Sequence, residues 1–278
     1  MERKKITMQD VKKEWMRHFP LLKPYPRCKL LMRLDIMLIG IELQTGSFSR
    51  SYRPHLCINQ LWLDPQVNAD FYIDYQVELK QPVKSIRRRW LRNVEIDYDR
   101  CDAMTVDEAA SLTEKQFGAL LKEKVYLDDI FKLNDYADKI NYMLYNPAFC
   151  LGTIELMIVL AKYFDDDDLT EYVRKKVDII FRRFRSRSVM EHYGKSKQEF
   201  KQYLFSRIGN REQIDHWTYV NSQNEKIQKL KKAHIIFDKS RFDFSDADQN
   251  LFIRGKESLK KFWYGRDHRK PWYIGVFQ

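Results

Sequence analysis

Residues 71–80 read FYIDYQVELK, and this stretch decides the fold of the N-terminal part of the chain. Its odd-numbered side chains, from Phe71 to Leu79, are apolar, and they alternate with more polar ones. Alternation with a period of two is typical of a β-strand that has one face on a core and the other toward water. The stretch therefore predicts a strand in an antiparallel sheet with one buried face.

Two earlier stretches carry the same signal. Residues 30–38 place five apolar side chains on one face. Residues 48–63 place Leu56, Ile58 and Trp62 on one face. The polar links at 44–47 and 64–69 suit hairpins. A helix should come first, because Val11, Trp15 and Phe19 recur at helical spacing and Pro20 ends the run. We therefore expect a helix followed by an antiparallel three-stranded meander.

The rest of the chain indicates helices. Thr105 with Glu108, and Ser196 with Glu199, have the spacing of capping boxes. Residues 148–164 are apolar on nearly all sides, which predicts a central buried helix. Four aspartates then open another helix that ends among arginines, and a further helix should run to about residue 232. The predicted class is α+β, with the helix and meander in residues 1–103 packed as one unit with a mostly helical region in residues 104–278.

Matching the apolar faces of the strands predicts their register. Residues directly opposite each other in an antiparallel pair point to the same face, so Leu56 opposite Val77 places His55 opposite Glu78. The same matching of residues 30–38 with residues 48–63 places Asp35 opposite His55. The result is a predicted row of two carboxylates around one histidine.

A histidine between carboxylates suits acid–base chemistry or metal binding. The candidate catalytic residues are Asp35, His55, Asp74, Glu78 and Lys80. A plainer interpretation is the solvated outer face of a half-buried sheet. Glu78-x-Lys80, preceded by Asp64 and Asp70 in a helix-then-strands context, also resembles the metal-dependent PD-(D/E)xK nuclease core over about the first ninety residues. That resemblance implies metal-dependent cleavage of phosphodiester bonds.

The net charge of +11 favours an anionic partner, either nucleic acid or an acidic protein. Basic side chains cluster with aromatic ones in three places, as expected for binding phosphates and stacking on bases. The candidate polyanion-binding residues are Arg87, Arg88, Arg89, Arg182, Arg183, Arg185, Lys260, Lys261, Arg266, Arg269 and Lys270.

Several function classes lack their sequence signals. The chain has no phosphate-binding P-loop, dinucleotide fingerprint, G-x-S-x-G or H-E-x-x-H motif, so we expect no cofactor and no bound metal. Four widely spaced cysteines and the absence of a secretory or transmembrane pattern indicate a cytoplasmic protein, of bacterial type given its compact build. We expect a non-enzymatic protein that binds a polyanion. A protein-interaction module, such as a regulator or toxin-neutralising partner, and a metal-dependent hydrolase using the sheet-face cluster remain alternatives.

Overall fold

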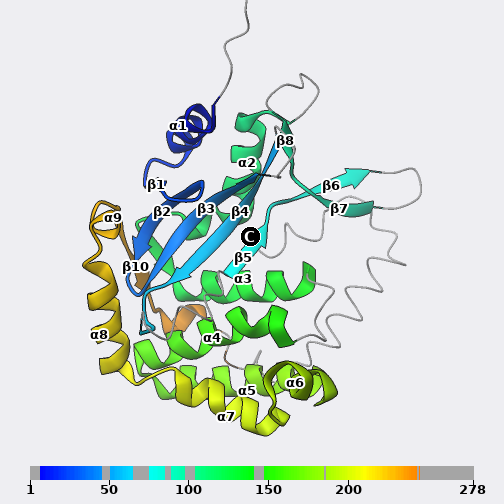
Figure 1. Ribbon diagram of the computed structural model, residues 1–278, viewed down its shortest axis with the longest axis vertical. Coiled ribbons are helices and arrows are strands. Elements are labelled where there is room, and N and C mark those ends of the chain that lie inside the picture. The colour runs from blue at the N-terminus through cyan, green and yellow to red at the C-terminus, as the bar shows by residue number, and fades with distance from the viewer. Residues whose placement is uncertain are drawn as a thin grey trace, which may run out of the picture. The chain divides into compact units, whose positions relative to one another are not determined.

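The computed structural model describes residues 7–45, 51–64, 75–84, 89–97, 104–140, 147–184, 186–242 and 244. An N-terminal helix, a mixed β-sheet and a series of helices form an α+β fold, which confirms the predicted class and the antiparallel meander after the first helix (Figure 1). The chain divides into two compact units. One comprises residues 1–61, 74–126 and 219–236, and the other comprises residues 62–73, 127–218 and 237–278.

The first unit contains the sheet. Its helical elements are α1 (Met8–His18), α2 (Val106–Phe117), the 3-10 turn η1 (Gly118–Leu120) and α9 (Glu225–Gln228). Its strands are β1 (Lys23–Tyr25), β2 (Lys29–Leu34), β3 (Met37–Thr45), β4 (Ser51–Gln60), β5 (Tyr75–Glu78), β6 (Lys80–Lys84), β7 (Arg89–Asn93), β8 (Ile96–Asp97), β9 (Lys124–Tyr126) and β10 (Lys232–Ile236). The main sheet runs β5-β4-β3-β2-β10-β9, and β6 and β7 form a separate two-stranded ribbon.

One face of this sheet forms the main core of the unit. Its buried side chains come from alternate positions of β2 to β5, and they include Leu30, Met32, Ile39, Ile41, Leu56, Ile58 and Val77. Helix α1 is joined to this face by Trp15, a fully buried residue whose Nε1 donates a hydrogen bond of 2.9 Å to the Tyr52 hydroxyl of β4. The buried indole therefore has its polar atom satisfied, as a core tryptophan requires.

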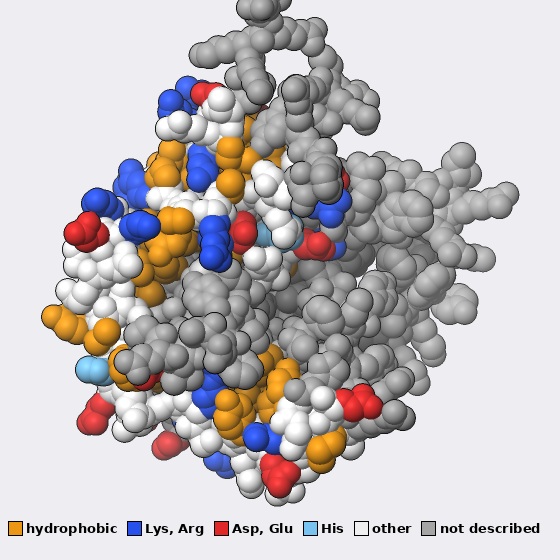
Figure 2. Space-filling view, in the orientation of Figure 1, with side chains coloured by type: hydrophobic (Ala, Val, Ile, Leu, Met, Phe, Trp, Pro, Cys, Tyr) orange, Lys and Arg blue, Asp and Glu red, His pale blue; other side chains and the backbone are white. Residues whose placement is uncertain are grey.

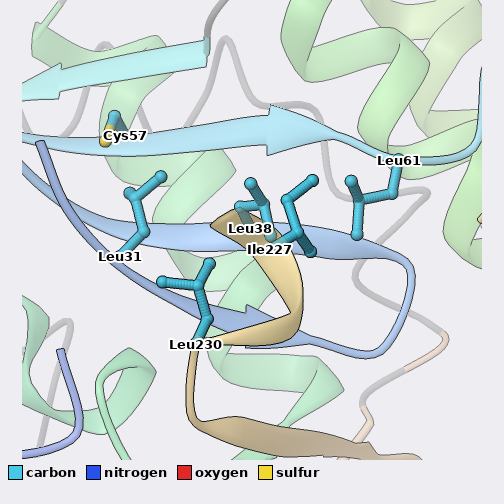
Figure 3. Packing of buried hydrophobic residues seen from close by; sticks show 6 residues of the cluster. All are labelled: Leu31, Leu38, Cys57, Leu61, Ile227 and Leu230. Carbon is cyan, nitrogen blue, oxygen red and sulfur yellow. The ribbon is translucent and has the colours of Figure 1, made fainter. Parts of the chain in front are cut away.

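The opposite face of the sheet is apolar at one end only. There Leu31, Leu38, Cys57 and Leu61 form a cluster with Ile227 of α9 and with Leu230 just after it (Figure 3). The short helix α9 thus uses its apolar side chains to cover the sheet. Its polar side chains are left for solvent.

Three expectations about this unit were wrong. The stretch after the predicted meander is not helical from its start, because β6, β7 and β8 come before α2. Residues 30–38 do not form one strand, because the chain turns at Asp35, which has a positive φ of 43°, and returns as β3. Leu38 consequently lies on the face opposite to Leu30. In addition, the expected helix up to residue 232 ends earlier, and β10 pairs in parallel with both β2 and β9. At the new hairpin a Cβ on Gly40 would lie 1.9 Å from the Leu30 carbonyl oxygen, so only glycine fits there.

The second unit consists of helices. Its elements include α3 (Leu127–Ile140), α4 (Pro147–Phe164), α5 (Asp167–Arg183), α6 (Ser186–Tyr193), α7 (Lys197–Arg207), α8 (Arg211–Ser222, whose last turn belongs to the first unit) and the 3-10 turn η2 (Lys239–Arg241). The capping box at Ser196 and Glu199 begins α7, and the one at Thr105 and Glu108 begins α2, both as predicted.

Helix α4 is the predicted buried helix. Every side chain from 151 to 161 is buried, and α4 packs against α3, α5 and α6. Its buried carboxylate, Glu155, accepts a 2.7 Å hydrogen bond from Nη1 of Arg207 in α7. Both side chains are almost fully excluded from solvent, so the pairing removes the cost of a lone buried charge. Among the residues described, no helix is both long and apolar enough to cross a membrane.

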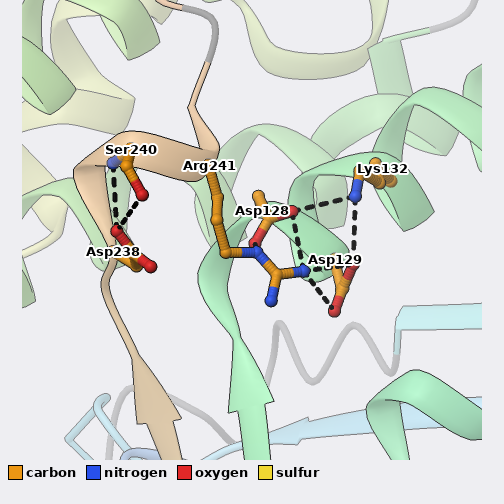
Figure 4. A network of polar contacts seen from close by, with 6 residues as sticks. All are labelled: Asp128, Asp129, Lys132, Asp238, Ser240 and Arg241. Carbon is orange, nitrogen blue, oxygen red and sulfur yellow. Dashed lines mark hydrogen bonds and ion pairs between the residues drawn. The ribbon is translucent and has the colours of Figure 1, made fainter.

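A polar network fixes the end of the described chain to α3. Nε of Arg241 in η2 lies 2.9 Å from a carboxylate oxygen of Asp128, and its Nη2 lies 3.4 Å from Asp129 (Figure 4). Nζ of Lys132 contacts the same two carboxylates at 2.8 and 3.1 Å. Two cations share two anions here, which makes this network a structural contact within the second unit.

Candidate functional site

A row of polar residues crosses five strands of the sheet on the face that α9 covers in part. The register pairs Tyr25 with Lys29, Lys29 with Glu42, Glu42 with His55, and His55 with Glu78. Each pair is antiparallel, so all five side chains point to the same face. Figure 2 shows blue, red and pale-blue side chains next to one another over the middle of this sheet. We call these five residues the polar row.

The charges of the polar row are paired, and those of Lys29 and Glu42 are largely buried. Nζ of Lys29 lies 3.6 Å from Oε2 of Glu42, and the two side chains are only 6% and 14% exposed. The same Oε2 accepts a hydrogen bond of 2.8 Å from Nε2 of Gln76. At the other end of the row, the Glu78 carboxylate forms an ion pair with Lys80, the first residue of β6. Burial also raises the pKa of Tyr25, against the opposing field of Lys29.

His55 is the central residue of the row. It is 6% exposed, and its Nε2 has no hydrogen-bond partner among the described residues. Burial lowers the pKa of His55, and the nearby Glu78 carboxylate and a hydrogen bond with Gln76 only partly oppose that effect. Since the ordinary histidine pKa is about 6.5, His55 is neutral at pH 7 and has one ring nitrogen without a partner.

The predicted pairing of His55 with Glu78 is confirmed, and Lys80 does lie beside Glu78. The predicted pairing of Asp35 with His55 is wrong, because β3 intervenes and Glu42 takes that place. Asp35 instead lies in the β2–β3 turn, where its carboxylate accepts hydrogen bonds from Nδ1 of His234 at 2.9 Å and from the Ile235 backbone at 2.7 Å.

The remaining candidates of the catalytic set do not join the row. Asp74 and Asp70 lie outside the described residues, and Asp64 belongs to the second unit. Of the residues that carry the nuclease resemblance, the described structure therefore brings together only Glu78 and Lys80. Sequence reasoning missed Lys29 and Glu42. The available signal was length, because the mostly apolar stretch of residues 30–43 is longer than the usual strand of about 3–10 residues.

The β6–β7 ribbon begins directly after the polar row. Its register pairs Lys80 with Asn93 and Lys84 with Arg89. Residues 80–93 contain six basic residues and no acidic one. The base of the ribbon is held by α2, since the Gln116 side chain exchanges hydrogen bonds with the backbone N–H and carbonyl of Lys80. Arg87 and Arg88 connect the two strands and lie outside the described residues, as do the ribbon's side chains beyond Lys80.

For the other predicted basic clusters, the structure describes only some of the residues. Arg182 and Arg183 end α5 in the second unit, and the Arg182 side chain is exposed. Arg185 and the whole C-terminal cluster lie outside the described residues. At the other end of α5 the Asp166 side chain caps the helix by accepting a hydrogen bond from the Leu169 backbone, as the acidic start predicted.

One group of described residues has the composition of a metal site. Glu14, His18 and Asp107 bring three ligand atoms within 4.8 Å of one another between α1 and α2. Two of the three residues are exposed, and each has a protein partner already. Nε2 of His18 lies 2.9 Å from Asp107, and Glu14 lies 2.8 Å from Arg17. These contacts account for the cluster as a surface ion-pair group.

Comparison with known proteins gives no relative: no protein-family model, curated protein or solved structure matches this chain. The function must therefore be argued from the residues themselves.

Proposed function

We propose that this protein is a cytoplasmic, non-enzymatic nucleic-acid-binding protein, and that the β6–β7 ribbon contacts the phosphate backbone. The observation that carries the proposal is the charge of the ribbon, with six basic residues and no acidic one between positions 80 and 93. Two-stranded ribbons are among the elements that enter nucleic-acid grooves. Cys28 and Cys57 are free thiols, which suits a reducing compartment.

The anchoring of the ribbon supports this role. Val94 donates a backbone hydrogen bond of 3.0 Å to the Leu79 carbonyl, so both ends of the ribbon are joined at its base. Gln116 adds two further hydrogen bonds at Lys80. A ribbon whose backbone is held at its base in this way should lose less conformational entropy on binding than a free loop.

The test is a comparison of two double variants in the full-length protein. The first, called the tip variant, is Arg87→Glu with Arg88→Glu, and it reverses two charges in the sequence segment between β6 and β7. Lys12→Glu with Lys13→Glu makes the same change in net charge on α1. Binding to labelled duplex DNA and single-stranded RNA is followed by fluorescence anisotropy at ~100 mM salt. The tip variant should bind about tenfold or more weakly than the α1 variant. Equal binding by the two variants would contradict the role of the ribbon.

A second candidate function, phosphodiester hydrolysis, has one specific observation in its favour: the partnerless Nε2 of buried, neutral His55 beside Glu78. A neutral imidazole nitrogen can accept a proton from an attacking group. Incubation of the same nucleic acids with wild type and with His55→Gln, with and without Mg²⁺, tests it. Cleavage that His55→Gln abolishes would establish this candidate, and intact nucleic acid under all conditions would remove it.

A further inference from the structure

A second basic surface lies on the first unit, and its residues belong to none of the three clusters that the sequence pattern identified. It is made of residues from two segments that meet in the sheet, residues 122–124 leading into β9 and residues 225–232 comprising α9 and the start of β10. The segments contain six lysines against two glutamates, a net charge of +4. We call these lysines the lysine surface: Lys122, Lys124, Lys226, Lys229, Lys231 and Lys232.

The strand register brings the two segments together. β9 pairs in parallel with β10, with Lys124 opposite His234, and Lys232 lies two residues earlier on β10. Lys232 is in turn opposite Arg33 of β2. Neighbouring strands are about 4.8 Å apart, so these basic side chains lie close together. Figure 2 shows Lys and Arg side chains gathered around α9 and the strands next to it.

The lysines of this surface are exposed, and within the described part of the chain none of them forms an ion pair. Other lysines do find carboxylates. Lys132 contacts Asp128 and Asp129, and Lys239 contacts Asp166 and Asp168. Six like charges without partners repel one another, and they attract an extended anion.

The packing of α9 indicates which kind of anion fits. Ile227 and Leu230, the apolar side chains of this segment, are buried against the sheet. A helix that binds a lipid surface needs an apolar face free to enter the membrane, and α9 has used its own in the core. A phosphate backbone needs only lysines and arginines at its surface.

We propose that the lysine surface binds the phosphate backbone of nucleic acid as a second contact area, in addition to the ribbon. The inference rests on the proposed function, because it extends the binding area of the same unit. The two glutamates, Glu123 and Glu225, reduce the charge of the surface without neutralising it. His234 lies at the edge of the surface, where its Nδ1 is 2.9 Å from Asp35 and its side chain is exposed.

The experiment reverses charges in the full-length protein. Lys231→Glu with Lys232→Glu changes the surface at β10, and Lys226→Glu with Lys229→Glu changes it at α9, so that one variant remains if the other does not fold. The Lys12→Glu, Lys13→Glu variant again serves as the matched control. Circular dichroism and thermal unfolding check the fold of each variant. Binding to duplex DNA, single-stranded RNA and vesicles containing anionic lipid is then measured from ~50 to 200 mM salt.

Each surface variant should bind both nucleic acids about tenfold more weakly than the control, and the slope of log affinity against log salt should fall by about two. Surface variants that bind like the control, while wild type binds and the tip variant does not, would overturn this inference and leave the proposed function standing. Wild type that binds no nucleic acid would overturn the proposed function itself. Tighter binding of wild type to the vesicles than to either nucleic acid would also contradict the inference.

Discussion

The polar row and the lysine surface are both charged regions of one unit, and they differ in burial and in pairing. In the row, the Lys29 and Glu42 side chains are 6% and 14% exposed and lie 3.6 Å apart. On the lysine surface, the side chains are exposed and have no carboxylate partner among the described residues. Charge alone therefore says little about function here. The combination of exposure and missing partners separates charges that can bind a ligand from charges that hold the fold.

The physical reason lies in desolvation. A buried ion loses several kcal/mol of hydration, and only a close counter-ion with further hydrogen bonds compensates for that loss. The row satisfies this condition through Lys29, Glu42 and Gln76. An exposed lysine keeps its water, and its field extends about 8–10 Å at physiological ionic strength. We therefore expect the largest effect on stability from substitutions in the polar row.

Glu42→Leu should cost about 3 kcal/mol or more in the free energy of unfolding, because it leaves the Lys29 ammonium buried without its carboxylate. It also removes the acceptor of the Gln76 side chain. Urea unfolding measures the loss. The double variant Lys29→Leu with Glu42→Leu is the control, since it removes both charges and should recover much of the stability. A loss below about 1 kcal/mol in the single variant would mean that the charges of the polar row are solvated. That result would contradict the difference in burial between the polar row and the lysine surface.

Asp35 connects the β2–β3 turn to β10, the strand that carries part of the lysine surface. Asp35→Ala should cost about 1–3 kcal/mol, because the Ile235 backbone N–H loses its acceptor and alanine is disfavoured at a φ of 43°. Asp35→Asn keeps a side-chain oxygen and tolerates a positive φ, so its loss should be smaller. Thermal unfolding of both variants measures the difference. Equal losses would show that neither the turn geometry nor the acceptor matters.

His55 should make stability depend on pH near neutrality. Burial holds its pKa in the folded state below the unfolded value of about 6.5, so the unfolded chain binds the proton more readily. The contribution of neutral His55 to the free energy of unfolding is fully present above pH 6.5. It is lost as the pH falls through that value toward the folded pKa. Urea unfolding from pH 8 to 5 should show a steeper loss for wild type than for His55→Gln. Parallel pH profiles would contradict a buried, neutral His55.

The strand pattern of the fold was predictable, and the turns were only partly so. Strict alternation in residues 71–80 gave the correct register of His55 with Glu78, because matching apolar faces excludes a slip of one residue. The hairpin at Asp35 was missed, because alternation continues through a turn that takes only two residues. Aspartate is one of the residues that accept a positive φ, so the turn was consistent with the sequence without being specified by it.

The lysine surface could not be predicted for a different reason. Its two segments are about a hundred residues apart, and they meet only because β10 returns to pair with β9 and β2. Parallel pairing of distant segments leaves no local pattern in the sequence. The segment from Lys226 to Lys232 looked like the end of a helix, in which lysines are expected near the C-terminus. The arginines of the ribbon, in contrast, were visible in the sequence as a local basic cluster, although its two strands were not predicted.

The salt dependence of nucleic-acid binding by the wild-type protein tests the central claim most directly. If the ribbon and the lysine surface neutralise phosphates, the logarithm of affinity for duplex DNA should fall linearly with the logarithm of salt concentration. We expect a slope of about −4 or steeper, since each neutralised phosphate contributes about −0.9. Absence of binding at ~50 mM salt, or affinity that does not change up to ~200 mM, would contradict the account, because phosphate contacts must release counter-ions.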